Sequence, residues 1–314
     1  MMPKDDTMDE RLDFTGRVAI VTGAGNGLGR EYARLLAERG ASVVVNDLGS
    51  TVDGTGRGSS VSEHAAAEIE AAGGIAVADG NSVATPEGGR AIVSTAMENF
   101  GRVDIVVNNA GILRDKAFHN MTEDAFEAVL DVHLRGAFHV TQPAWIHMRD
   151  QGYGRIVNAT SSAGLLGNFG QANYGAAKMG LVGLTRVLAV EGERHGIVAN
   201  AIAPIARTRM TESVLGENLV HQVDAAKVAP MVAVLAHESC SVTGHVYTAG
   251  GGRFARFFVG MSPGWTKASG VVEPEEVLSN FEQIDDVGDF IVPSNSIDEL
   301  RVLRRALKEA ESSP

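Results

Sequence analysis

Short apolar runs alternate with longer amphipathic stretches along most of this 314-residue chain. The runs are rich in Val and Ile and show little internal alternation, which is typical of parallel strands covered on both faces. We expect strands at 18–22, 42–46, 75–78, 105–108, 156–160, 198–203 and 245–248. The stretches between them predict helices at 30–39, 62–72, 88–100, 123–148 and 173–195. This order predicts an α/β fold in which a doubly wound parallel sheet carries helices on both faces.

The pattern changes after Gly252. The chain becomes aromatic and Gly-rich, and two acidic helices are predicted at 273–282 and 296–311, the first with Pro274 in its opening turn. We therefore expect one domain at 12–252, a C-terminal extension at 253–314 that acts as an interface or lid, and a flexible tail at 1–11.

Composition and charge narrow the class of protein. Hydrophobic residues make up 44% and charged residues 21%, as in ordinary globular proteins. The 27 basic and 39 acidic residues give a net charge of −12, which argues against a nucleic-acid partner. Residues 1–11 carry −2 and residues 271–314 carry −7, so the core between them carries only −3. An anionic substrate therefore meets little repulsion at the core.

Several other classes find no support in the sequence. The one cysteine, Cys240, cannot form an internal disulfide framework or a Cys-rich zinc site, and no histidine spacing predicts a metal site. The polar start does not look like a signal peptide, no apolar run is long enough to span a membrane, and the last residues are not a peroxisomal address. We expect a cytoplasmic protein, and the frequency of symmetric assemblies favours a homodimer or homotetramer.

A glycine-rich turn follows the first predicted strand. It reads Gly23-Ala24-Gly25-Asn26-Gly27-Leu28-Gly29 and leads into a helix. Glycines let the backbone approach a pyrophosphate closely, and the start of a helix offers free N–H groups and partial positive charge. The spacing differs from the common G-x-G-x-x-G fingerprint, because it reads Thr-Gly-x-x-x-Gly-x-Gly.

Two further strand ends fit a dinucleotide site. The second strand ends at Asp47, 24 residues after Gly23, where a carboxylate can accept both ribose hydroxyls of NAD and repel the 2′-phosphate of NADP. The alternatives are that Asp47 only caps a turn, or that Arg57 in the following loop favours NADP. The fourth strand ends at Asn108-Asn109-Ala110-Gly111, where Asn side chains can lock the sheet and the small pair leaves room for adenosine.

The candidate catalytic residues follow the fifth predicted strand. Ser161 and Ser162 directly follow that strand, and Tyr174 and Lys178 lie four residues apart, on one face of the next predicted helix. A neighbouring ammonium favours the phenolate and should lower the pKa of Tyr174, which could then exchange a proton with a substrate oxygen. Either serine could bond the same oxygen, and we favour Ser161.

These motifs together make the chain resemble the short-chain dehydrogenase/reductase family. The residues that carry the resemblance are 22–29, 108–111, Ser161, Tyr174 and Lys178. Segments 46–49, 109–115, 133–136 and 167–174 are similar to one subgroup, the (3R)-hydroxyacyl-CoA dehydrogenase part of peroxisomal multifunctional enzyme type 2 (17β-hydroxysteroid dehydrogenase type 4). The resemblance starts near Leu12 and weakens after Gly264.

The resemblance implies a Rossmann-like fold, NAD as cofactor and an alcohol–ketone interconversion. Tyr174 would be the acid/base, Lys178 would hold the nicotinamide ribose, and Ser161 would orient the substrate oxygen. The substrate would be a (3R)-hydroxyacyl-CoA, including one that bears a sterol side chain, or a 17β-hydroxysteroid. The implied cofactor-binding residues are Gly23, Gly25, Asn26, Gly27, Leu28, Gly29, Asp47, Asn81, Ser82, Asn109, Ala110, Gly111, Tyr174, Lys178 and Pro204.

The chain departs from the broad family at three points. His133 replaces an Asn that supports a proton relay, so the role passes to His133, to water or to neither; a packed histidine bonded to backbone is the alternative. Pro204-Ile205 replaces the usual Pro-Gly. No hydratase or sterol-carrier segment follows, which suggests a stand-alone bacterial enzyme.

Other interpretations of single segments and of the function remain open. The basic aromatic cluster at 253–258 suits a subunit interface better than the phosphates of CoA, and the loop at 207–216 should select the substrate. A rival function is an NADPH-dependent 3-oxoacyl-(acyl-carrier-protein) reductase, which Asp47 opposes. A non-catalytic NAD-binding module is a remote alternative, since such a module has no need of a proton donor.

Overall fold

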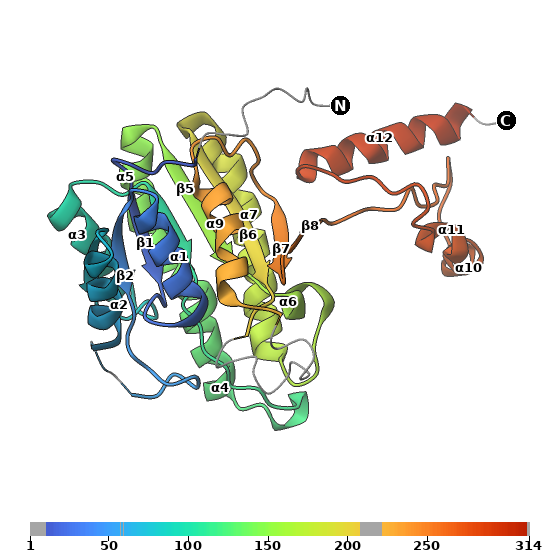
Figure 1. Cartoon of the computed structure of the whole chain (residues 1–314). Coiled ribbons are helices and arrows are strands. Elements are labelled where there is room, and N and C mark those ends of the chain that lie inside the picture. The colour runs from blue at the N-terminus through green and yellow to red at the C-terminus, as the bar shows by residue number, and fades with distance from the viewer. Residues whose placement is uncertain (1–10, 57, 59, 208–221, 313–314) are drawn as a thin grey trace. The chain divides into compact units, whose positions relative to one another are not determined.

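A single eight-stranded sheet forms the centre of the protein in this computed structural model, which describes residues 11–56, 58, 60–207 and 222–312. The strand order is β3-β2-β1-β4-β5-β6-β7-β8 (Figure 1). The strands are β1 Val18–Thr22, β2 Ser42–Asn46, β3 Ile75–Asp79, β4 Ile105–Asn108, β5 Gly154–Ala159, β6 Ile197–Pro204, β7 Val246–Gly250 and β8 Arg253–Phe257. Strands β1 to β7 run parallel. The chain starts in the middle of the sheet, winds to β3 and then to β7, which confirms the doubly wound fold.

Helices connect successive strands and cover the sheet. They are α1 Gly27–Glu38, α2 Ser60–Ala71, α3 Pro86–Phe100, α4 Glu123–Leu130, α5 Gly136–Gln151, α6 Ser162–Leu166, α7 Ala172–Gly192 and α9 Ala229–Ala236. Short turns of 3₁₀-helix lie at η1 Phe118–Asn120, η3 Glu193–His195 and η4 Ala225–Lys227. The prediction of a single helix at 123–148 is wrong in one respect. A π-helical turn, η2 Asp131–Arg135, separates α4 from α5.

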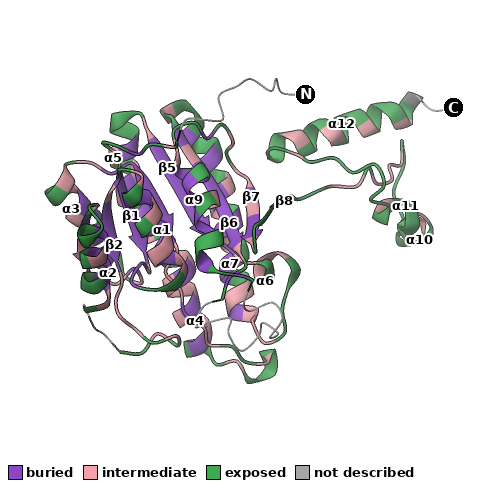
Figure 2. Cartoon of the chain, viewed as in Figure 1, coloured by how far each residue is buried: buried purple, intermediate pink, exposed green. Residues whose placement is uncertain are grey.

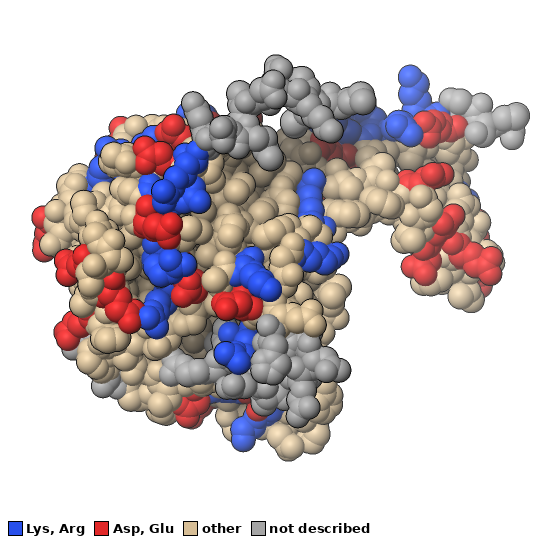
Figure 3. Space-filling model, in the orientation of Figure 1, with Lys and Arg blue, Asp and Glu red and all other residues tan. Residues whose placement is uncertain are grey.

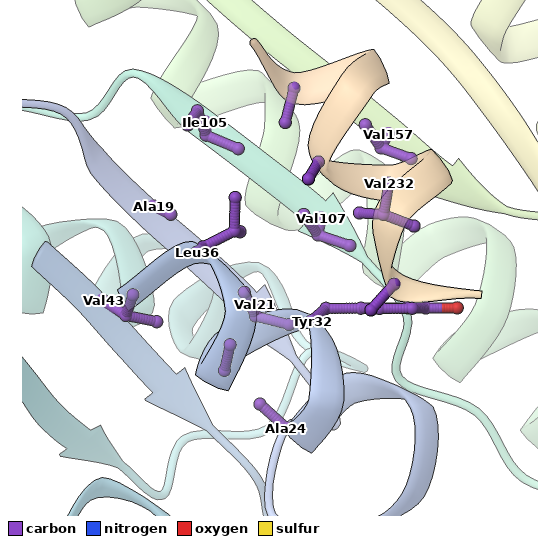
Figure 4. Close-up of a cluster of buried hydrophobic side chains, with 14 of the residues drawn as sticks. Ala19, Val21, Ala24, Tyr32, Leu36, Val43, Ile105, Val107, Val157 and Val232 are labelled. Carbon is purple, nitrogen blue, oxygen red and sulfur yellow. The ribbon is translucent and has the colours of Figure 1, made fainter. Parts of the chain in front are cut away.

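The strands bury both faces, and the helices divide between them (Figure 2). In β1, Ala19 and Val21 point to one face, while Val18 and Ile20 point to the other. Helices α1, α2 and α9 pack on the first face, where Tyr32 of α1 and Val232 of α9 are fully buried (Figure 4). Helices α3 and α5 cover the second face. Successive residues of a strand point to opposite faces, so a strand covered on both sides must be apolar throughout.

Residues 257–312 form a second compact unit. It contains α10 Pro274–Ser279, α11 Phe281–Asp285 and α12 Ser296–Ser312. The rings of Phe258 and Phe290 stack with centroids 5.4 Å apart, and a bridge pairs Met261 with Ile291. The one helix predicted at 273–282 is in fact two, α10 and α11. Acidic side chains are prominent on this unit, as its composition requires (Figure 3). Within the described residues, no helix has the length and apolar character of a membrane span.

Candidate active site

The predicted site residues follow the carboxyl ends of successive strands. The Gly-rich turn follows β1, Asp47 follows β2, Asn81 and Ser82 follow β3, Asn109 follows β4, Ser161 lies just beyond β5, and Pro204 ends β6. Because these strands are parallel, all of these residues lie at one edge of the sheet. Open α/β sheets bind ligands at this edge, where the strand order reverses around β1 and β4.

A cavity of about 460 Å³ opens at this edge. The structure brings eleven of the predicted cofactor residues together around it: Gly23, Asn26, Gly27, Leu28, Gly29, Asp47, Asn81, Ser82, Asn109, Ala110 and Gly111. The wall also includes residues that were not predicted to bind the cofactor, among them Ser50, Thr51, Val52, Gly54, Val83, Ala84, Ile112 and Arg114. The volume is within the usual range of small-molecule and cofactor sites.

Two glycines of the turn after β1 occupy positions that do not tolerate a side chain. Gly23 has a φ of +63°, which disfavours other residues. A methyl group at Gly29 would lie 2.2 Å from the carbonyl oxygen of Gly23 and 2.5 Å from Nδ2 of Asn109. The first N–H groups of α1 have no partner within the helix, and this start of the helix lines the cavity. The arrangement fits the diphosphate of a nicotinamide dinucleotide, which needs close backbone approach and N–H donors.

Asp47 joins the Gly-rich turn to the loop after β2. One carboxylate oxygen accepts a hydrogen bond from the Gly25 N–H at 2.9 Å, and the other accepts one from the Gly49 N–H at 2.7 Å. Gly25 is therefore bonded to the site although it does not line the cavity. A carboxylate oxygen can accept more than one hydrogen bond, so Asp47 keeps capacity for ribose hydroxyls. Arg57, the residue that favoured NADP, lies outside the described residues.

The Asn108-Asn109 pair locks the strand ends together. Nδ2 of Asn108 donates to Oγ1 of Thr141 and Oδ1 of Asn158, both at 2.8 Å. Nδ2 of Asn109 donates to the carbonyl oxygens of Thr22 at 3.0 Å and Gly23 at 3.1 Å. The N–H groups of Asn109 and Ala110 both donate to Oγ1 of Thr22. These bonds fix the floor of the cavity between β1 and β4.

Ser161, Tyr174 and Lys178 come together next to this cavity. The Ser161 side chain caps α6 by accepting a hydrogen bond from the Ala163 N–H at 3.2 Å, and its hydroxyl is near enough to Tyr174 to influence the pKa of that residue. Lys178 lies one turn further along α7, with Nζ 5.4 Å from the centroid of the Tyr174 ring, and it donates to the carbonyl oxygen of Ala159. Lys178 is buried, whereas Ser161 and Tyr174 remain partly accessible.

Burial dominates the electrostatics of these side chains. It raises the pKa of Tyr174, and only the neighbouring Ser161 hydroxyl opposes this. The expected lowering of that pKa by Lys178 is therefore not found, because the ammonium lies over the ring and is itself desolvated. Burial lowers the pKa of Lys178 to about 7, so this group gains and loses its proton near neutral pH.

His133 lies between the cavity wall and Tyr174. It sits in the π-helical turn, fully enclosed, with Nε2 3.0 Å from the Ile112 nitrogen and 2.8 Å from the Ile112 oxygen. Its ring packs edge-on against Tyr174, with centroids 5.1 Å apart, and its Nδ1 has no partner among the described residues. Burial, followed by the charge of Lys178, holds the pKa of His133 well below its usual value. The imidazole is therefore neutral, and it packs in the interior with its Nε2 bonded to backbone, as the packing alternative expects.

Comparison with known proteins decides the family. The short chain dehydrogenase family profile matches residues 17–218. The chain belongs to the short-chain dehydrogenases. It is 55% identical over 240 residues to the short-chain type dehydrogenase/reductase Rv0148 of Mycobacterium tuberculosis, covering 76% of this chain and 84% of that protein. It is 42% identical over 227 residues to the hydroxyacyl-CoA dehydrogenase ChsB1 of the same organism, covering 70% and 69%.

A solved structure extends the likeness to nearly the whole chain. The full-length peroxisomal multifunctional enzyme type 2 from Drosophila melanogaster superposes with a TM-score of 0.82 at 36% identity. The match covers 96% of this chain but only 51% of that enzyme, so this dehydrogenase spans about half of its length. The predicted family, the likeness to this enzyme and the oxidoreductase class are confirmed.

Some predicted parts of this dehydrogenase site are not brought to the cavity. Within the described residues, Ser161, Tyr174, Lys178 and Pro204 do not line it. The substrate loop predicted at 207–216 lies outside the described residues except for Arg207. No group of three or more His, Cys, Asp or Glu side chains in the described part of the chain is arranged to hold a metal ion.

Proposed function

We propose that the chain is an NAD-dependent oxidoreductase that interconverts the secondary alcohol and the ketone at carbon 3 of (3R)-hydroxyacyl-CoA esters. Esters with a sterol side chain and 17β-hydroxysteroids belong to the same proposed range, because they too carry a secondary alcohol on a bulky apolar body. The proposal rests on one observation: Ser161, Tyr174 and Lys178 lie together beside a cavity that Asp47 lines.

The cluster can move one proton at the substrate oxygen. A bound nicotinamide dinucleotide supplies the hydride acceptor, and its positive ring favours the phenolate of Tyr174. The Tyr174 oxygen takes the hydroxyl proton during oxidation and returns it during reduction. The Ser161 hydroxyl lies beside Tyr174 and can hold the same substrate oxygen. We assign Lys178, whose Nζ lies 5.4 Å from the centroid of the Tyr174 ring, to the nicotinamide ribose.

Asp47 supports NAD over NADP. Its carboxylate is fixed by two backbone N–H groups, from Gly25 and Gly49, and lines the cavity at the end of β2. A fixed carboxylate accepts hydrogen bonds from two ribose hydroxyls and repels a phosphate in that position. The described cavity wall includes one basic side chain, Arg114, and its Nε donates to the carbonyl oxygen of Asp53.

The relatives support the substrate class. One relative is named as a hydroxyacyl-CoA dehydrogenase, and it covers 70% of this chain. A second candidate, the NADPH-dependent reductase of 3-oxoacyl groups on acyl-carrier protein, uses the same proton chemistry. The two differ in cofactor and in the carrier of the acyl group.

The test is a matrix of two cofactors and three substrates. Purified protein is incubated with NAD or NADP and a (3R)-hydroxyacyl-CoA or a 17β-hydroxysteroid, and with NADH or NADPH and a 3-oxoacyl-(acyl-carrier protein). The proposal expects NADH formation with the CoA ester and at least tenfold higher kcat/KM for NAD. Preference for NADPH and the carrier protein establishes the rival, and NADH binding without any turnover establishes a binding module.

A further inference from the structure

The loop that follows β2 forms one wall of the cavity. Residues 50–55 of this loop are here termed the strap, and four of them line the cavity: Ser50, Thr51, Val52 and Gly54. The cavity is also lined by Ile112 and Arg114, which follow β4, and residues 112–114 are here termed the anchor. Because β1 lies between β2 and β4 in the sheet, a contact between the strap and the anchor bridges the cavity at the end of β1.

Two hydrogen bonds, here termed the latch, fasten the strap to the anchor. The Leu113 N–H donates to the carbonyl oxygen of Val52 at 2.9 Å. Nε of Arg114 donates to the carbonyl oxygen of Asp53, also at 2.9 Å. Each bond joins the two sides of the cavity, so breaking both of them would free the strap from the anchor.

The strap is a small turn with internal bonds of its own. The Thr51 N–H donates to the Thr55 oxygen at 2.9 Å, and the Gly54 N–H donates to the Thr51 oxygen at 3.0 Å. The Asp53 carboxylate accepts hydrogen bonds from the hydroxyls of Thr51 and Thr55, which lower its pKa to about 2. The turn also packs on the anchor, because a methyl group added at Gly54 would lie 3.0 Å from Cδ1 of Ile112. Its internal bonds let the strap keep its shape when the latch breaks.

The anchor is fixed to the catalytic helix, whereas the strap is not. Nδ2 of buried Asn173 donates to the Arg114 oxygen at 3.0 Å, and Oδ1 of Asn173 accepts a hydrogen bond from the Tyr174 N–H at 2.8 Å. Nε2 of buried His133 lies 2.8 Å from the Ile112 oxygen. None of the six strap residues, all of which the structure describes, is buried. Segments with few buried contacts open locally at low free energy, so the strap is the side that moves.

We propose that the strap is a gate for the nicotinamide dinucleotide: it opens when the latch breaks, and it closes over the bound cofactor. This inference rests on the proposed function only in placing that cofactor between Asp47 and Tyr174. The strap begins three residues after Asp47 and meets the anchor, which Asn173 joins to Tyr174. It therefore extends from the ribose end towards the reacting end of a bound dinucleotide, which has to pass it to enter or leave.

A gate and a simple contact change the kinetics of binding in different ways. The cofactor waits for a gate in both directions, so a weaker latch raises the association and the dissociation rate constants together. Loss of a simple contact raises the dissociation rate constant and leaves association nearly unchanged. Loop opening limits product release in many enzymes, so the latch should also set how fast NADH leaves.

The first test measures both rate constants for NADH by stopped-flow fluorescence. Arg114→Met removes one bond of the latch, and Gly54→Ala pushes the strap away from Ile112. We expect each variant to raise both rate constants about fivefold. The matched control is Gly56→Ala, because Gly54 and Gly56 have φ values of +85° and +82° but a methyl group at Gly56 meets no atom within 4 Å. Its rate constants should stay within about twofold of wild type.

The second test locks the strap covalently. The Cβ position of Gly54 lies 3.7 Å from Cβ of Ile112, which matches the spacing in a disulfide. Oxidation of the double variant Gly54→Cys/Ile112→Cys should slow both NADH entry and NADH release by about tenfold or more, and reduction should restore them. The control is Ile112→Cys alone under the same oxidation. The native Cys240 is buried and does not compete.

These measurements need no acyl substrate, so they separate the gate from the proposed reaction. Gated exchange of NADH in a protein that oxidises no hydroxyacyl-CoA supports the gate and overturns the reaction. Normal turnover with unchanged rate constants in the crosslinked protein overturns the gate alone. A rise in the dissociation rate constant without a rise in association shows that the strap only contacts the cofactor, and this also overturns the gate. Failure of the two introduced thiols to form a disulfide contradicts the closed strap.

Discussion

Substitution of Gly111 by Ala should push His133 out of its place. The added methyl group would lie 2.3 Å from Cε1 of His133 and 3.1 Å from each ring nitrogen. Carbon atoms in contact lie about 3.5–4.0 Å apart, so the ring has to retreat by more than about 1 Å. It cannot do so freely, because Ile112 bonds its Nε2 and the Tyr174 ring packs against it.

The size of the effect follows from these contacts. Overfilling a packed interior costs about 1–3 kcal/mol, and a lost buried hydrogen bond adds about 1 kcal/mol. We therefore expect Gly111→Ala to lower the free energy of unfolding by about 2–4 kcal/mol, measured by urea denaturation.

The matched control for this substitution is Gly183→Ala. Gly183 lies in α7 with nothing within 4 Å of the added carbon, so the change should raise stability by up to about 1 kcal/mol. A Gly111→Ala protein within about 0.5 kcal/mol of wild type would refute the account of a rigid imidazole between the cavity and Tyr174.

Three further predictions concern charge. The pKa of folded His133 lies well below 6.5, so below about pH 6.5 the unfolded chain binds a proton that the folded chain does not. The free energy of unfolding should therefore decrease by up to about 1.4 kcal/mol for each unit by which the pH falls. Urea denaturation of His133→Asn should show a shallower decrease, and equal slopes would contradict the lowered pKa. The folded pKa of Lys178 is about 7 against 10.5, so wild-type stability should rise with pH between these values, and Lys178→Met should lose that rise; a rise that persists in the variant contradicts the burial of Lys178. Asp47→Asn should weaken NADH binding about tenfold or more and NADPH binding less, in fluorescence titrations; equal losses would show that Asp47 only braces the Gly25 and Gly49 backbone.

Much of the fold could be predicted from the sequence because strands buried on both faces leave an unmistakable pattern. The strands at Val18–Thr22, Ser42–Asn46 and Ile105–Asn108 have the predicted bounds, since each contains an uninterrupted apolar run that ends at a polar residue. The helix α9 was missed because Ala229–Ala236 is short and apolar on nearly every side, and such a run has no readable periodicity.

The sequence likewise predicts some residues of the candidate site and not others. The residue type and position of glycines and of Asp or Asn at strand ends indicate their role, so eleven of the residues that line the cavity could be predicted. Ile112, Val52 and Thr51 line the same cavity, but nothing in their residue type distinguishes them from structural neighbours. The π-helical turn around His133 also has no local signal, and the raised pKa of Tyr174 depends on burial that only the tertiary structure defines.

The most direct test of the central claim is single-turnover oxidation of a (3R)-hydroxyacyl-CoA by wild type and by Tyr174→Phe, with NADH binding measured on both. The account predicts that the variant loses about a hundredfold or more in the rate of NADH formation while the Kd for NADH changes little, because only the proton-carrying oxygen is removed. An unchanged rate in the variant would contradict the assignment of Tyr174 as the acid and base of this dehydrogenase.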